Sequence, residues 1–381
     1  MGCCQHAPSR PADPSKPAEG PGALVGVVIE RQSADPSKEA PAPDNAALVA
    51  ENAVLKGSEL DAEADALLAR VQQLLQEDAN VLEAATQLST MLSRVEPAAE
   101  TEASRISNKV RDSQVFKEVL LRMRQYHSVM EIVPQSTDFK LMWEKENSIL
   151  WLHHSQDATW FEYKVASYFD MQLRDLGCAL HEMDLQAKFQ PMIVGAPRYL
   201  GPHNRHLMIV QSLVSALVTR IELIVEVMRF VNLDVGFWAE RIRSDFPKEG
   251  VPIPPEHWRN KRIAADTRQL MIPCGGGKQG TIVTNVTRVD VGFRIPSFLL
   301  KFFCDRLSQD YLDNLAKIAR LFQQPDHPWK ARLAADVDHF YEELSRAEEA
   351  AAKREAFSLK QPPGPEIFAG PWSSGSSPFK P

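Results

Sequence analysis

Cysteine is scarce in this chain of 381 residues. There are only five, and Cys178, Cys274 and Cys304 lie far apart in apolar surroundings. This pattern excludes a disulfide-stapled scaffold and is typical of small buried side chains in a reducing compartment. A run of about 18 apolar residues is also missing, and the opening segment MGCCQHAPS lacks the apolar core of a secretory signal. We therefore expect a cytoplasmic protein without a membrane-spanning helix.

Positive charge and metal-binding clusters are sparse too. The chain has 43 Lys and Arg residues against 50 Asp and Glu, and its net charge of −7 comes without a dense basic patch. The composition therefore predicts no nucleic-acid partner. His153 and His154 are adjacent, so in a strand they point to opposite faces and cannot hold one metal ion. No acid, base or nucleophile stands out, and we predict a non-enzymatic protein with no cofactor, metal or catalytic residue.

Proline is concentrated at the two ends of the chain. Eight prolines precede residue 46 and six follow residue 355, so 14 of the 27 lie in segments 1–45 and 355–381. Both segments are rich in Pro, Gly and Ser and have no apolar period. Such segments bury too little surface to offset the entropy of ordering, so we predict that both tails are disordered.

The first residues carry a lipidation pattern. Once Met1 is removed, Gly2 is a candidate for myristoylation, and Cys3 and Cys4 are candidates for palmitoylation. One acyl chain binds a membrane only marginally, whereas two give stable residence. His6 stands where the motif usually has Ser or Thr, and an unmodified N-terminus is the alternative. We predict dual acylation, which would hold the protein peripherally at a membrane surface.

Between the tails the apolar period changes several times. Segment 46–105 is acidic and helical, and over 58–95 its apolar stripe predicts packing on the main domain or contact with a protein partner. A further helix is predicted at about 112–127. The segments FKLMWEKE, SILWLHHS and TWFEYKVAS then predict three strands. A helical stretch at about 169–189 precedes six predicted strands, at about 192–200, 205–217, 219–231, 235–243, 266–273 and 280–291.

The last predicted strand leads through a proline into a long apolar helix. Its segment, TRVDVGFRIPSFLLKFFCDRLSQDYLDNLAKIARLF, covers residues 287–322, and Pro296 lies where the start of a helix tolerates proline. About nine antiparallel strands form a sheet large enough to curl, and its apolar face needs a cover. We predict that this helix covers that face and encloses either a filled core or a cavity.

This order of elements resembles the START family, the StAR-related lipid-transfer module of the helix-grip fold. RVDVGFRIPSFLLKFFCDRLSQDYLDNLAKIA is similar to the family's last strand, proline loop and C-terminal lid helix. YKVASYFDMQLRDLGCALHEMDLQAKFQP is similar to its third strand and the helices after it, in which Glu182 or Asp184 and Phe189 would form an acidic and aromatic pair. The resemblance covers about residues 110–324. It implies an α+β fold with a curved antiparallel β-sheet wrapped around a long C-terminal helix.

The resemblance also implies a function. A domain over residues 106–325 would bind one lipid of unspecified class in a hydrophobic cavity, for transfer or sensing, and a helical extension over 326–354 would follow. The candidate lining residues come from a central strand and from the lid helix: Ile221, Leu223, Val225, Val227, Phe298, Leu299, Phe302 and Phe303. The alternatives are a membrane-tethered scaffold with a filled core and a cyclase- or aromatase-like enzyme of the same fold. The Pro-rich insertion at 246–262 departs from the family pattern.

Overall fold

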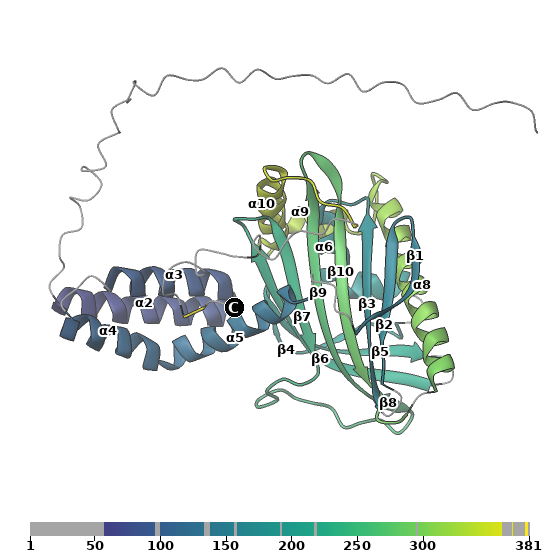
Figure 1. Cartoon of the computed structure of the whole chain (residues 1–381), viewed down its shortest axis with the longest axis horizontal. Helices are drawn as coiled ribbons and strands as arrows, with labels where there is room; N and C mark the ends of the chain where they lie inside the picture. Colours follow the sequence, from purple (N-terminus) through teal and green to yellow (C-terminus); the bar gives the residue numbers. More distant parts are fainter. Residues whose placement is uncertain are drawn as a thin grey trace, which may run out of the picture. The chain divides into compact units, whose positions relative to one another are not determined.

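The computed structural model describes residues 57–95, 100–132, 138–155, 158–190, 193–216, 219–294 and 296–359, together with 368, 378 and 379. All of these residues fall within one compact unit, Val54–Pro381. Helices and one large sheet make up this unit (Figure 1). The predicted tail over 1–45, with its acylation residues, lies outside the described residues.

The described chain begins with helices that are joined by short connections. They are α2 (Gly57–Glu77), α3 (Val81–Val95), α4 (Glu100–Asp112) and α5 (Gln114–Met130). The hydroxyl of Ser113 caps α5 by accepting a hydrogen bond from the backbone N–H of Phe116 at 3.1 Å. The sequence did not predict α4 as a separate helix, although its first residues fall in the predicted helical segment 46–105, because its described buried apolar side chains, Ile106 and Val110, are too few to show a clear period.

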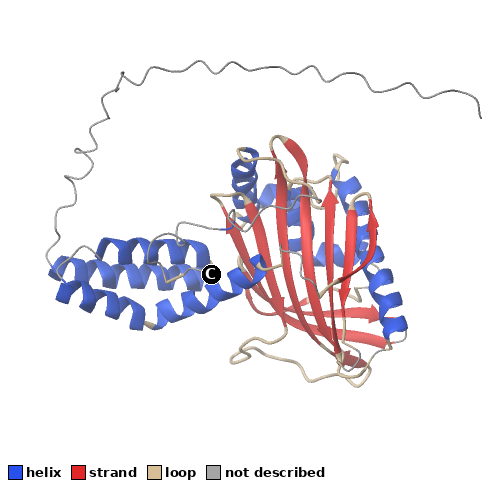
Figure 2. Ribbon diagram, in the orientation of Figure 1, coloured by secondary structure: helices blue, strands red, loops and turns tan. Residues whose placement is uncertain are grey.

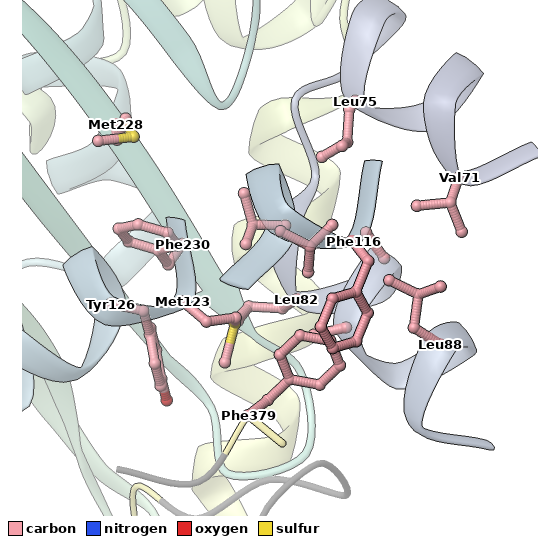
Figure 3. Close-up of a cluster of buried hydrophobic side chains, with 14 of the residues drawn as sticks. Val71, Leu75, Leu82, Leu88, Phe116, Met123, Tyr126, Met228, Phe230 and Phe379 are labelled. Carbon is pink, nitrogen blue, oxygen red and sulfur yellow. The ribbon is translucent and has the colours of Figure 1, made fainter. Parts of the chain in front are cut away.

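The apolar faces of these helices pack on one another and on the sheet. The shared cluster includes Val71, Leu88, Phe116, Met123, Met228 and Phe230 (Figure 3). On the solvent side, acidic residues of α2 pair with cations of neighbouring helices, as Glu63 does with Arg94 at 2.5 Å. The apolar stripe over 58–95 is therefore used within the chain, and a protein partner for its acidic side stays a prediction.

Within the described ranges, the sheet has ten strands. They are β1 (Lys140–Lys145), β2 (Ser148–His153), β3 (Trp160–Phe169), β4 (Arg198–His203), β5 (Leu207–Ala216), β6 (Thr219–Asn232), β7 (Phe237–Arg243), β8 (Asn260–Arg262), β9 (Ala264–Gly275) and β10 (Lys278–Asp290). Antiparallel neighbours follow the order β1-β2-β3-β10-β9-β7-β6-β5-β4, and β8 pairs in parallel with β6. Figure 2 shows the strands of this sheet in red and the helices in blue. The sequence predicted nine of these strands. It missed β8, which is only three residues long and lies within the insertion.

Alternation along β7 separates the two faces of the sheet. Phe237 and Ala239 join the cluster formed with α5, whereas Trp238 joins a second cluster. That second cluster contains residues of α6 (Leu173–His181), α7 (Met183–Phe189) and α8 (Ser297–Phe322). We call the face that carries Trp238 the inner face and the other the outer face. The predicted α+β fold, with a curved antiparallel sheet and a long C-terminal helix, is confirmed.

The C-terminal extension adds α9 (Lys330–Ala335) and α10 (Phe340–Ala352). Phe340, Leu344 and Ala347 are buried in the inner-face cluster, where α10 packs against α6. The two helices approach closely at Gly177, because a Cβ on that glycine would lie 2.1 Å from Cδ1 of Leu344. The extension therefore completes the inner core.

Two of the described residues in the predicted disordered tail over 355–381 are buried. Phe379 packs against Phe116 with 5.3 Å between ring centroids, and the Tyr126 hydroxyl donates to the carbonyl of Phe368 at 3.1 Å. Both phenylalanines lie in the outer-face cluster. Composition misleads here because two aromatic side chains are enough to anchor a segment that otherwise has no apolar period. Disorder stays a prediction for the rest of the tail outside the described residues.

Candidate functional site

The predicted strand residues share the inner face. Odd-numbered positions of β6 point to this side, and Leu223, Val225 and Val227 pack with Met208 and Val210 of β5. Met183 of α7 closes over the same cluster. Ile221 lies on the same face near the start of β6 and is partly buried, but outside this cluster. The predicted facing of these four side chains agrees with the register, and their contact with a lipid stays a prediction.

A row of polar side chains crosses the inner face beside this apolar cluster. Arg229 of β6 is paired in register with Glu240 of β7, Glu240 with Gln269 of β9, and Gln269 with Asn285 of β10. The Nε of Arg229 donates to Oε1 of Glu240 at 2.9 Å, and the Nδ2 of Asn285 donates to Oε1 of Gln269 at 2.9 Å. Arg229, Glu240 and Gln269 are buried. The inner face thus combines an ion pair and an amide pair with apolar walls.

Hydroxyl groups extend this polar row toward α8. The Oγ1 atoms of Thr267 and Thr287 lie 3.0 Å apart, and Thr287 also donates to Oδ1 of Asn285 at 2.7 Å. Burial raises the pKa of Tyr163, and it raises the pKa of Tyr311 on α8, with the negative charge of Glu240 nearby. Both phenols are therefore neutral at physiological pH, and each carries an O–H group on the inner side of the sheet.

Two buried serines and one tryptophan add polar atoms that have no partner among the described residues. They are the hydroxyls of Ser167 and Ser212 and the indole Nε1 of Trp238. Ser212 stands opposite Leu223 and Ser167 opposite Val283, so both hydroxyls are on the inner face. A buried polar atom without a partner costs free energy, so it calls for water or a ligand. The inner face therefore has unused hydrogen-bonding capacity.

Helix α8 covers the inner face with an apolar stripe, as the sequence predicted, although one of the predicted lining residues points away from the sheet. The side chains turned toward the sheet and its neighbouring helices are Leu300, Cys304, Tyr311, Leu315 and Ile318. Phe302 is 59% exposed and lies on the opposite side of the helix from Leu300 and Cys304, so its predicted inward direction is wrong. The side chains of Phe298, Leu299 and Phe303 lie outside what the structure describes.

The acidic and aromatic pair implied by the family resemblance holds helices together. Glu182 accepts a hydrogen bond from the hydroxyl of Tyr341 at 2.6 Å, and Asp184 pairs with Arg332 at 3.0 Å. Phe189 packs against Trp329 with 4.9 Å between ring centroids. These contacts tie the α6–α7 segment to α9 and α10. The positions of Glu182, Asp184 and Phe189 are therefore accounted for by contacts between helices, without a contact to the polar row.

Sequence reasoning missed the polar row itself. One signal was present, because Arg229 follows Ile221, Leu223, Val225 and Val227 at the same alternating positions and interrupts an apolar face with a charge. A charge on a buried face needs a partner, which would have directed attention to Glu240 on the next strand. Gln269 and Asn285 gave no comparable signal, since only the register of β9 and β10 places them in the row.

Comparison with known proteins finds similar solved structures. One is human StAR-related lipid transfer protein 5, with a TM-score of 0.47 and 13% identity over 55% of this chain and 100% of that one. Human STARD10 has a TM-score of 0.48 and 12% identity over 62% of this chain and 91% of that one. A StAR-related lipid transfer protein from Xanthomonas axonopodis has a TM-score of 0.41 and 17% identity over 48% and 99%. No family model and no curated protein matches the chain.

Among the described residues, no helix is both long and apolar enough to pass through a bilayer. Within the same ranges, no three His, Cys, Asp or Glu side chains gather in a way that could hold a metal ion.

Proposed function

We propose that the chain binds a single lipid against the inner face of its sheet and carries or senses it without catalysis. The observation that carries this proposal is the polar row Arg229–Glu240–Gln269–Asn285, whose first three side chains are buried, set in an apolar face beneath one long helix. A lipid has the same two-part chemistry, a polar group and a long apolar part. Burying its CH₂ groups contributes roughly 0.8 kcal/mol each, and the polar row supplies hydrogen bonds at one defined place.

The chemistry of the row narrows the class of lipid. The charges of Arg229 and Glu240 are paired with each other, so neither offers an uncompensated charge. The amides and hydroxyls around them donate and accept hydrogen bonds without a net charge. We therefore expect the buried polar group of the ligand to be a neutral hydroxyl or amide rather than a phosphate. Leu223, Val225 and Val227 would contact the apolar part, and Ser212 lies opposite Leu223 as a further hydroxyl.

Native mass spectrometry of the full chain, after incubation with a mixed lipid extract, tests this proposal. We expect a one-to-one adduct that identifies the lipid class. Gln269→Leu removes an inner-face amide and should lower adduct occupancy, whereas Gln211→Leu removes an outer-face amide that donates to Glu222 and should not. Folded wild-type protein that shows only the mass of the bare chain would refute the lipid site and favour a scaffold with a filled core.

Movement of α8 would admit the lipid. Cys304 of α8 and Phe161 of β3 share one buried cluster at the first turns of the helix. In a Phe161→Cys variant, a disulfide to Cys304 would lock the helix to the sheet, with formation checked by mass. We expect oxidation to slow lipid exchange between vesicles and a reductant to restore it. Equal exchange by the locked and reduced forms would refute gating by α8.

Dual acylation at Gly2, Cys3 and Cys4 completes the proposal, by analogy with two-signal membrane anchors. The intact mass of protein from its native cell should show one myristoyl and at least one palmitoyl group. A Gly2→Ala variant should then shift from the membrane fraction to the soluble one. A bare N-terminus on the native protein would remove the tether from the proposal and leave the lipid site untouched.

A further inference from the structure

Trp258 is the most exposed of the large aromatic side chains that the structure describes, with 81% of its surface open to solvent. It lies in the insertion over 246–262 that departs from the family pattern. The backbone N–H of Asn260 donates to the carbonyl of His257 at 2.8 Å, so Trp258 and Arg259 form the tip of a tight turn. An indole is costly to leave in water. Its position at the tip of a turn therefore suggests an apolar or interfacial partner.

The turn is held firmly on the sheet. On one side, β8 pairs with β6 immediately after the turn, and Arg262 contacts the buried carboxylate of Glu222 at 2.7 Å. On the other side, Phe246 is buried on the outer face in a cluster with Leu200, Ile209 and Ile224. Both ends of the insertion are thus anchored, and the exposure of Trp258 is a property of the folded chain.

One cation stacks on the exposed indole, and others lie in the same insertion. The guanidinium carbon of Arg259 lies 4.5 Å from the centroid of the Trp258 ring, and Lys248 and Lys261 are exposed in the same insertion. Over 246–262 four basic residues stand against two acidic ones, in a chain whose net charge is −7. A hollow of about 430 Å³, lined by residues 256–261, lies beside the turn. Local charge at this place is therefore opposite in sign to that of the whole molecule.

Two more exposed aromatic side chains belong to the same end of the sheet. Asp290, the last residue of β10, pairs with Ala264, which follows β8 by two residues, so both chains leave the sheet at one edge. Phe293 lies three residues after the end of β10, and Phe302 lies in the second turn of α8; each is 59% exposed. Figure 1 shows β8 and the beginning of α8 at this end. Three separate segments thus bring exposed aromatic rings to one end of the molecule.

We propose that this end, led by Trp258, is a docking surface for an anionic lipid bilayer. Tryptophan prefers the level of the headgroups, where its ring is buried and its N–H stays wet, and nearby Lys and Arg are attracted to anionic lipids. The combination of a projecting indole with Arg259, Lys248 and Lys261 fits that boundary. A flat or grooved protein interface would instead place its aromatic anchor in a recess among other apolar side chains. The proposal does not depend on a lipid bound at the inner face.

Vesicle sedimentation of the full chain, produced without acylation, tests the proposal. The vesicles are phosphatidylcholine alone, or phosphatidylcholine with about a third phosphatidylserine. We expect binding to the anionic vesicles that weakens as salt is added. Trp258→Ala should weaken it at least about tenfold, because the indole no longer enters the interface. Lys261→Gln should weaken it about fivefold through the loss of one cation.

The matched control is Val337→Ala, which truncates a side chain that is 89% exposed between α9 and α10. It should bind like wild type, and urea unfolding should show that all variants are folded. Binding of Trp258→Ala equal to wild type would overturn the proposal. So would equal binding to neutral and anionic vesicles, or no binding of folded wild-type protein, which would point to a protein partner. Vesicle sedimentation tests the docking surface and native mass spectrometry tests the lipid site at the inner face, so either proposal can be refuted without affecting the other.

Discussion

Arg229 and Glu240 face each other across neighbouring strands of the sheet, with the Nε of the arginine 2.9 Å from Oε1 of the glutamate. Both are almost fully buried, and the guanidinium carbon lies 5.5 Å from the centroid of the Phe340 ring on α10. Burial raises the pKa of Glu240, and the charge of Arg229 opposes that rise. The pair therefore links the sheet to the C-terminal helix, and each charge depends on the other.

Replacing Arg229 alone should destabilise the protein strongly. Arg229→Met leaves the Glu240 carboxylate buried without its partner, which typically costs about 3–5 kcal/mol. Urea unfolding of wild type and variant measures the difference. In the double variant Arg229→Met with Glu240→Leu no charge is left unpaired, and most of the loss should be recovered. A double variant no more stable than the single one would contradict this account of the pair.

His181 should make stability depend on pH. Burial, followed by the charges of Arg229 and His203, lowers the pKa of His181 to about 2. An unfolded chain takes up this proton near pH 6.5, so the unfolded state binds more protons between these values and stability falls as the pH falls below 6.5. Lowering the pH from 6.5 to 5 should therefore reduce the free energy of unfolding by about 2 kcal/mol through this one group.

The test of His181 compares urea unfolding at pH 6.5 and pH 5. The centroids of the His181 and Phe340 rings lie 5.1 Å apart, and His181→Phe keeps a ring at this place. Its free energy of unfolding should fall by about 2 kcal/mol less than that of wild type between pH 6.5 and pH 5. Val337→Ala, an exposed substitution that changes no titratable group, should lose as much as wild type. Identical pH dependence of His181→Phe and wild type would show that the folded state accepts the proton.

Gly177 should be intolerant of even one methyl group. Its added Cβ would lie 2.1 Å from Cδ1 of Leu344, so Gly177→Ala should cost about 1–3 kcal/mol through overpacking between α6 and α10. A double-mutant cycle tests this: the free energies of unfolding of Gly177→Ala, Leu344→Ala and the double variant are compared with that of wild type. The cost of Gly177→Ala should shrink when Leu344 is already shortened. An unchanged cost would mean that α10 does not pack closely on α6.

Phe379 should stabilise the protein despite its place in a Pro- and Gly-rich tail. It is 1% exposed and packs on Phe116, so Phe379→Ala should cost about 3 kcal/mol. Phe302→Ala makes the same truncation at an exposed ring and should change the unfolding free energy by less than about 0.5 kcal/mol. Thermal and urea unfolding measure both variants. Equal free energies of unfolding for Phe379→Ala and wild type would show that Phe379 does not pack against the core in solution.

Local patterns accounted for most of the elements. Strand β6 was predicted from alternation at 219–231 and extends over Thr219–Asn232. Helix α8 was predicted from its apolar period and Pro296, and it begins at the next residue. Elements with weak local signals were missed: α4 buries few apolar residues, and β8 owes its extended form to pairing with β6. Phe302 shows a further limit, since a helix apolar on several sides does not reveal which side faces the sheet.

By itself, the sequence determined the order of the helices and strands other than α4 and β8, the common face of Ile221, Leu223, Val225 and Val227, and the long helix after the last strand. These features follow from the backbone periods of 3.6 and 2 residues, which act over short stretches. Only the tertiary structure decided that Arg229, Glu240, Gln269 and Asn285 form one row, that α10 completes the inner core, and that Trp258 is held at a fixed tip. Those relationships join residues tens or hundreds of positions apart, and strand register and packing, which no local period encodes, bring them together.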